Sequence, residues 1–149
     1  MTTTIEPVDL DINQVRVIVQ GMVRVAGADG IHERELALIR EFYDACRADV
    51  KGLANFDDIQ LEQFDAKKAR QALNTESLQQ SFLASCYLLA YADGVVSQKE
   101  LDEIDVLVRE LGIGEEIAKS TRDLIKDILV MQLAKSDNME ALQKISSEL

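Results

Sequence analysis

Residues 92–100, Ala-Asp-Gly-Val-Val-Ser-Gln-Lys-Glu, join two apolar helical patterns and decide how the chain folds. Gly94 stands where a helix can end in the left-handed backbone conformation that glycine adopts most easily. Ser97 is a typical helix N-cap, and Glu100 follows it by three residues, which is the spacing of a capping box. The stretch therefore predicts a helix, a tight acidic loop and a second helix.

The segments on either side carry the clearest helical patterns in the chain. Residues 76–92 are apolar on nearly every side in their second half, which predicts a buried central helix. After Ser97, apolar residues follow one helical stripe that ends at Gly112, a suitable left-handed cap. The apolar residues of the central helix are Leu78, Phe82, Leu83, Cys86, Tyr87, Leu89 and Ala90.

Residues 28–35, Ala-Asp-Gly-Ile-His-Glu-Arg-Glu, repeat this arrangement with a loop that is one residue shorter. His32 stands in the place of Ser97, and Glu35 stands in the place of Glu100. Two copies at this spacing predict two related helical hairpins packed around a pseudo-twofold axis.

The whole chain, residues 1–149, is expected to form one compact domain of six to eight helices with no sheet. The two hairpins span about residues 12–47 and 76–111. Residues 1–11 are expected to be a loose arm, in which Asp11 or Asp9 caps the first helix. Residues 49–74 are the least regular part and predict one or two short helices.

Two more helices are predicted after the second hairpin. Gly114 opens the first of them, and Glu115 and Glu116 occupy its first turn, where the helix dipole favours negative charge. The second is short and begins from a cap at Asp137 or Asn138.

Composition supports an all-α fold and limits the partners. The 149 residues are 47% hydrophobic and 5% aromatic, with one proline. With 16 basic and 27 acidic residues, the net charge is −11, so general binding to nucleic acid is disfavoured. Cations, or a protein partner with a basic surface, are the expected counterparts.

The sequence also carries information about the location of the chain and the role of its two cysteines. The first residues lack the pattern of a signal peptide, and no apolar stretch is long enough to span a membrane. A cytoplasmic location without direct membrane insertion is therefore expected. Cys46 and Cys86 lie inside apolar helical segments, where they are expected to be small buried hydrophobes.

The candidate site residues are the loop acids Asp29, Glu35, Asp93 and Glu100. In one interpretation they are helix and turn caps that accept backbone N–H groups. In the other they converge to bind a divalent cation (Ca²⁺, Mg²⁺ or Zn²⁺) through oxygen atoms. We favour the caps and keep the cation site as the alternative.

The second loop matches only the back half of a calcium-binding EF-hand loop. Asp93, Gly94 and Glu100 take its fifth, sixth and twelfth positions. Leu89 and Tyr91 stand where the leading oxygen ligands belong. Any cation site here must therefore take oxygens from elsewhere in the fold.

No catalytic pattern is present in the sequence. His32 is the only histidine, and it has no nucleophile at a recognisable spacing. Phosphate loops, zinc-ligand clusters and dinucleotide fingerprints are absent from the sequence. The acids after Lys99 are expected to form a solvated face, with Lys99–Glu103 and Asp105–Arg109 as local ion pairs.

The two Ala-Asp-Gly loops, each following an apolar helix rich in small residues, resemble those of the TerB-like family. The resemblance covers about residues 15–129 and implies an all-helical, internally symmetric domain without established enzymatic activity. It further implies metal ions at the loop acids Asp29, Glu35, Asp93 and Glu100, and a role in stress responses that include tellurite resistance.

Two functions follow from different classes. The first is a non-enzymatic interaction module in a stress-response or membrane-associated complex, which requires no cofactor and meets basic partners through its acidic surface. The second is a domain that binds or senses a divalent cation. A melt in chelator and in each ion distinguishes them.

Overall fold

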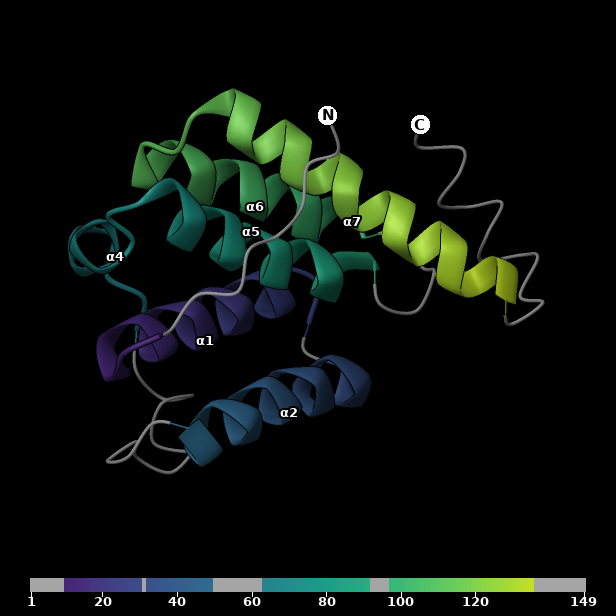
Figure 1. Cartoon of the computed structure of the whole chain (residues 1–149), viewed down its shortest axis with the longest axis horizontal. Helices are drawn as coiled ribbons and strands as arrows, with labels where there is room; N and C mark the ends of the chain where they lie inside the picture. Colours follow the sequence, from purple (N-terminus) through teal and green to yellow (C-terminus); the bar gives the residue numbers. More distant parts are fainter. Residues whose placement is uncertain (1–9, 31, 50–62, 92–96, 136–149) are drawn as a thin grey trace.

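The computed structural model describes residues 10–30, 32–49, 63–91 and 97–135 (Figure 1). All regular secondary structure in these ranges is helical, which confirms the all-α prediction. The described helices are α1 (Ile12–Gly27), α2 (Glu33–Asp49), α4 (Ala66–Ala72), α5 (Glu76–Tyr91), α6 (Gln98–Leu111) and α7 (Glu115–Lys135). None of them is long and apolar enough to cross a membrane.

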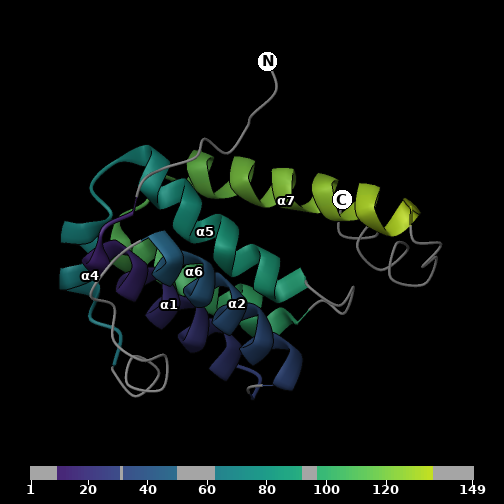
Figure 2. The same cartoon turned by 60° about the horizontal axis from the view of Figure 1, so that its bottom comes forward.

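Helix α5 is the centre of the packing, as its apolar second half predicts. It packs against α1, α2, α6 and α7, and α7 and α1 lie on different sides of it (Figures 1 and 2). Every apolar residue named above for this helix is buried. The largest side chains that are fully removed from solvent are Tyr43, Tyr91, Phe82, Ile18 and Ile39.

The helix ends follow the local capping rules. Asp11 caps α1 and forms a capping box with Gln14. The Ser97 side chain accepts a hydrogen bond from the Glu100 backbone N–H at the start of α6. Gly112 ends α6 in the left-handed conformation, with φ of 66°, and the next backbone N–H bonds to Val108. These caps confirm the predicted boundaries of α1 and α6.

Both predicted hairpins are packed pairs: α1 contacts α2, and α5 contacts α6. Their internal symmetry stays a prediction. In its described part, from residue 63 onward, the irregular stretch contains one short helix, α4, between Asp65 and Leu73. Asp93, Gly94 and the predicted C-terminal helix lie outside the described residues.

The two cysteines differ in burial. Cys86 is buried in α5, as predicted, whereas Cys46 is only half-buried on α2. Cys46 packs against the edge of the core, because it falls near the end of α2.

Candidate functional site

Two glutamates at equivalent places in the two hairpins are buried. Glu35 lies in the first turn of α2 and is 5% exposed, and Glu100 lies in the first turn of α6 and is 3% exposed. Fully buried glutamates are rare unless another group compensates their charge. These two buried glutamates therefore mark the candidate functional site.

The two carboxyl groups are hydrogen-bonded to each other. Burial, the hydrogen bond to Glu35 and the negative charges of Glu35 and Asp29 raise the pKa of Glu100 to about 9. At neutral pH the Glu100 carboxyl therefore keeps its proton and donates a hydrogen bond to the Glu35 carboxylate. Glu35 Oε2 is buried and has no other hydrogen-bond donor in the described structure. Buried polar atoms of folded proteins normally have a hydrogen-bond partner, so this oxygen is a suitable place for a donor or a cation.

Asp29 connects the first loop to the start of α6. The Ser97 hydroxyl donates a 3.0 Å hydrogen bond to Asp29 Oδ2, and Lys99 Nζ lies 4.0 Å from Asp29 Oδ1. Gly30 follows in the left-handed conformation with φ of 75°, which lets the chain turn toward α2. The contact joins the end of the first hairpin's loop to the start of α6.

These residues border an open cavity of about 580 Å³. We call Asp29, Glu35, Ser97 and Glu100 the loop-junction site. His32 Nε2 lies 3.9 Å from Glu35 Oε1 at the exposed edge of this site. The cavity is lined by Asp29, His32, Glu33, Arg34, Glu35, Leu89, Ala90, Ser97 and Glu100.

The structure thus brings together three of the four predicted site residues, Asp29, Glu35 and Glu100. The fourth, Asp93, lies outside the described residues. Within the described ranges, no three Asp, Glu, His or Cys side chains are already grouped as metal ligands. The arrangement offers two touching carboxyl groups and a third carboxylate nearby, which are oxygen ligands of the type that hard cations prefer.

Ser97 caps its helix as predicted, whereas the side chains of Glu100 and Asp29 contact the other hairpin. The Glu100 backbone N–H is bonded to Ser97, but the Glu100 side chain is hydrogen-bonded to Glu35. Asp29 likewise contacts the Ser97 hydroxyl and the Lys99 ammonium group from the other hairpin. These tertiary contacts depend on how the helices pack, so the local spacing gave no sign of them.

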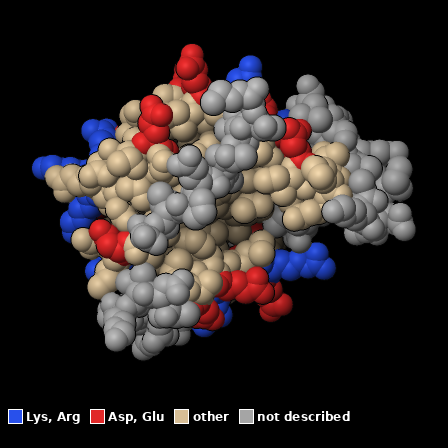
Figure 3. Space-filling model, viewed as in Figure 1, with Lys and Arg blue, Asp and Glu red and all other residues tan. Residues whose placement is uncertain are grey.

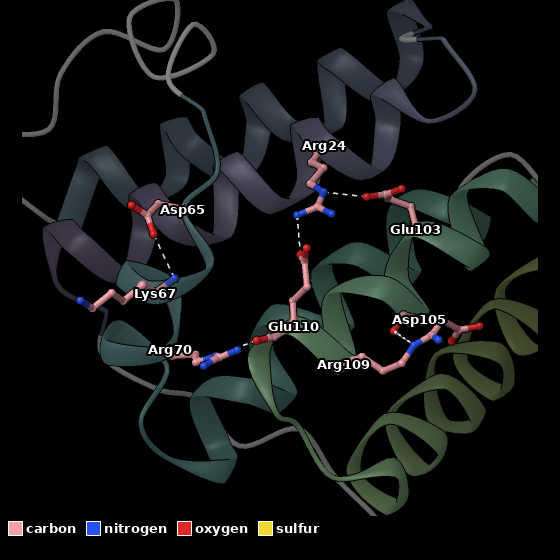
Figure 4. Close-up of polar contacts among 8 residues, drawn as sticks. All are labelled: Arg24, Asp65, Lys67, Arg70, Glu103, Asp105, Arg109 and Glu110. Atoms are coloured by element: carbon pink, nitrogen blue, oxygen red, sulfur yellow. Dashed lines mark hydrogen bonds and ion pairs between the residues drawn. The ribbon is translucent and has the colours of Figure 1, made fainter.

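A second polar cluster lies one turn farther along α6 (Figure 4). Arg24 Nε donates to Glu103 Oε1 at 2.6 Å, and Arg24 Nη1 donates to Glu110 Oε2 at 2.7 Å. We call these three residues the Arg24 cluster. The predicted pairing of Glu103 with Lys99 was wrong, because Glu103 turns toward α1.

The predicted ion pair between the side chains of Asp105 and Arg109 is replaced by a contact with the backbone. Arg109 Nε contacts the backbone oxygen of Asp105 at 3.4 Å (Figure 4). Sequence reasoning missed the Arg24 cluster. Its signal in the sequence is the spacing of Glu103 and Glu110, which lie two turns apart on one side of α6.

A larger cavity, of about 970 Å³, lies at the other end of α1. Its lining includes Asp11 and Asp65, whose carboxylates act as helix caps. None of its charged lining residues is buried. The buried carboxyl pair therefore makes the smaller cavity the better candidate site.

Comparison of the chain with protein-family models, with curated proteins and with solved structures finds no match.

Proposed function

We propose that this chain is a non-enzymatic module that binds a divalent cation between the first turns of α2 and α6. The observation that carries the proposal is the contact of two buried glutamates, Glu35 and Glu100, one from each hairpin. Apart from the Glu100 carboxyl, no described group donates to the buried Glu35 Oε2, and Glu100 holds a proton that a cation can replace. A cation that replaces this proton compensates the negative charges of the Glu35 and Glu100 carboxylates.

The chemistry of the site favours a hard ion. Its donors are carboxylate and hydroxyl oxygens, which suit Ca²⁺ and Mg²⁺. Asp29 is close enough to the other repeat to add a third carboxylate after it releases Lys99. Asp93 is a further proposed ligand. Zn²⁺ belongs in the test because His32 borders the site.

The TerB-like resemblance points in the same direction. It assigns metal ions to the same loop acids and places such domains in stress responses, including tellurite resistance. Membership of this family, the absence of an enzymatic activity and a cytoplasmic location are parts of the proposal.

Thermal melts provide the direct test. Protein treated with chelator is melted alone and then with Ca²⁺, Mg²⁺ or Zn²⁺. A bound ion adds RT ln(1 + [L]/Kd) to the free energy of unfolding, which is about 2.7 kcal/mol at 100 times Kd. Glu35→Gln and Glu100→Gln should each remove this ion-dependent rise.

Glu116→Gln is the matched control, because Glu116 is exposed in the first turn of α7. It should respond to ions as the wild type does. Melting temperatures that ignore all three ions, or an equal ion response in all four proteins, would refute a cation at this site.

A second candidate function is an acidic interaction module, which the chain's charge of −11 favours. In the view of Figure 3, the described acidic side chains lie in separate places along the outline of the visible face, with basic side chains between them. The proposed partner is a protein with a basic surface, including one in a membrane-associated complex. An oligolysine peptide should bind at low salt and dissociate at high salt; no binding at low salt contradicts this function.

A further inference from the structure

One side of α6 carries three glutamates, of which Glu103 and Glu110 contact Arg24 of α1. Glu100, Glu103, Leu107 and Glu110 follow one another at intervals of three or four residues, which places them on one stripe of the helix. Leu107 is fully buried within this stripe, and α6 packs against α1. The loop-junction site uses the first glutamate, and the Arg24 cluster uses the other two.

Arg24 holds this stripe from two points. Its 2.6 Å and 2.7 Å contacts reach glutamates two turns apart on α6, so they resist both sliding and rotation of the helix. Burial, the largest single influence, acts to lower the pKa of Arg24. The hydrogen bonds to Glu110 and Glu103, together with their charges, raise it overall. Arg24 is therefore a permanent cation in this cluster.

Arg24 lies near the end of α1, five positions before Asp29, and Glu103 follows Glu100 by three. Any shift of α6 along α1 thus changes the separation of Asp29 from Ser97 and Glu100. We propose that Arg24 is a positioning residue that holds Glu100 in register with Asp29 and Glu35 for cation binding. This inference rests on the proposed function and adds a residue that does not touch the ion.

An arginine suits this role better than a lysine. Its planar group directs separate N–H donors at two carboxylates, whereas an ammonium group acts as a single point charge. The Arg24 guanidinium also lies 5.5 Å from the centre of the Phe64 ring, which restricts its orientation. Arg24→Lys therefore keeps the charge and loses the two-point geometry.

The first test is the Kd of Ca²⁺ at a temperature where every variant is folded. Outer-shell substitutions at metal sites cost about 10–100-fold in affinity, so Arg24→Gln should weaken binding about tenfold, with little recovery in Arg24→Lys. Arg70→Gln is the control, because Arg70 Nε donates to the backbone oxygen of Glu110, at 2.6 Å, and not to its carboxylate, so the variant leaves both Arg24 contacts in place. The Kd of Arg70→Gln for Ca²⁺ should stay within about twofold of the wild-type value, well below the change expected for an outer-shell substitution.

General destabilisation is controlled with Ile125→Val, a core change between α7 and α5. If Ile125→Val weakens Ca²⁺ binding as much as Arg24→Gln at an equal loss of melting temperature, the positioning role is refuted. An Arg24→Gln protein that binds Ca²⁺ as tightly as the wild type refutes it too.

A second readout separates this inference from the proposed function. In the ion-free protein, Arg24→Gln should displace the NMR amide signals of Asp29, Ser97 and Glu100, and Arg70→Gln should leave them in place. Unchanged signals refute the positioning role, whatever the ion data show. If the signals are displaced but the wild-type protein binds no ion, the register role of Arg24 is supported and only the cation site is refuted.

Discussion

Glu100 donates a hydrogen bond to Glu35, and this contact joins the first turn of α6 to the first turn of α2. Each glutamate occupies the corresponding place in its own hairpin. Because both are buried, their charges interact strongly, and the site retains a proton that two exposed glutamates would release. The same property makes the pair sensitive to pH and to cations.

The pH dependence of stability should show the shared proton. Folded Glu100 holds its proton up to about pH 9, whereas a glutamate in the unfolded chain releases it near pH 4.5. Between these values the folded state binds more protons, so the free energy of unfolding falls as pH rises, by up to about 1.4 kcal/mol per pH unit.

Glu100→Gln should flatten this part of the pH profile. The amide donates permanently to Glu35, so the variant should melt above the wild type at pH 8 in chelator. Glu116→Gln should keep the wild-type slope, since Glu116 is exposed. Melts from pH 5 to 9 measure both effects, and equal slopes in wild type and Glu100→Gln contradict the shared proton.

The central position of α5 predicts unequal effects at two neighbouring leucines. Leu89 is 3% exposed and Leu88 is 41% exposed. Leu89→Ala should cost about 2–5 kcal/mol, because it leaves a cavity in the core. Leu88→Ala should change the free energy of unfolding by about 0.5 kcal/mol or less. Urea denaturation compares them, and similar losses in the two variants would remove α5 from the core.

Two glycines of α1 provide a second matched pair. A Cβ at Gly21 would overlap the ring of Phe82, where α1 and α5 approach closely. Gly21→Ala should therefore cost about 1–3 kcal/mol. A Cβ at Gly27 meets nothing within 4 Å, and its φ is not positive, so Gly27→Ala should stabilise by about 0.4–1 kcal/mol. Chemical denaturation should find Gly21→Ala less stable than the wild type and Gly27→Ala more stable. A stabilised Gly21→Ala protein contradicts this packing.

Much of the fold could be predicted because its signals are local. The apolar second half of α5, the Ser97 cap and the glycine at 112 each depend on neighbouring residues alone. The four site candidates were also found locally, as acids at fixed distances from a glycine. Local spacing does not reveal which carboxylates touch across the fold.

The contacts that were missed depend on packing between helices. Glu103 lies four residues from Lys99, which favours a local pair, yet the packing of α1 on α6 brings Arg24 closer. Lys126 shows the same limit, since it is 4% exposed and its Nζ lies 6.0 Å from the centre of the Tyr91 ring. The sequence interpretation of α7 followed its apolar stripe and did not place a lysine against it.

The most direct test of the cation site is a calorimetric titration of chelator-treated protein with Ca²⁺ at neutral pH. The account predicts one saturable site per chain, with proton release as the ion replaces the Glu100 proton. Glu35→Gln should abolish this binding, and Glu116→Gln should preserve it. No binding up to about 10 mM Ca²⁺, above the weakest range of extracellular calcium modules, or unchanged binding in Glu35→Gln, would contradict the account.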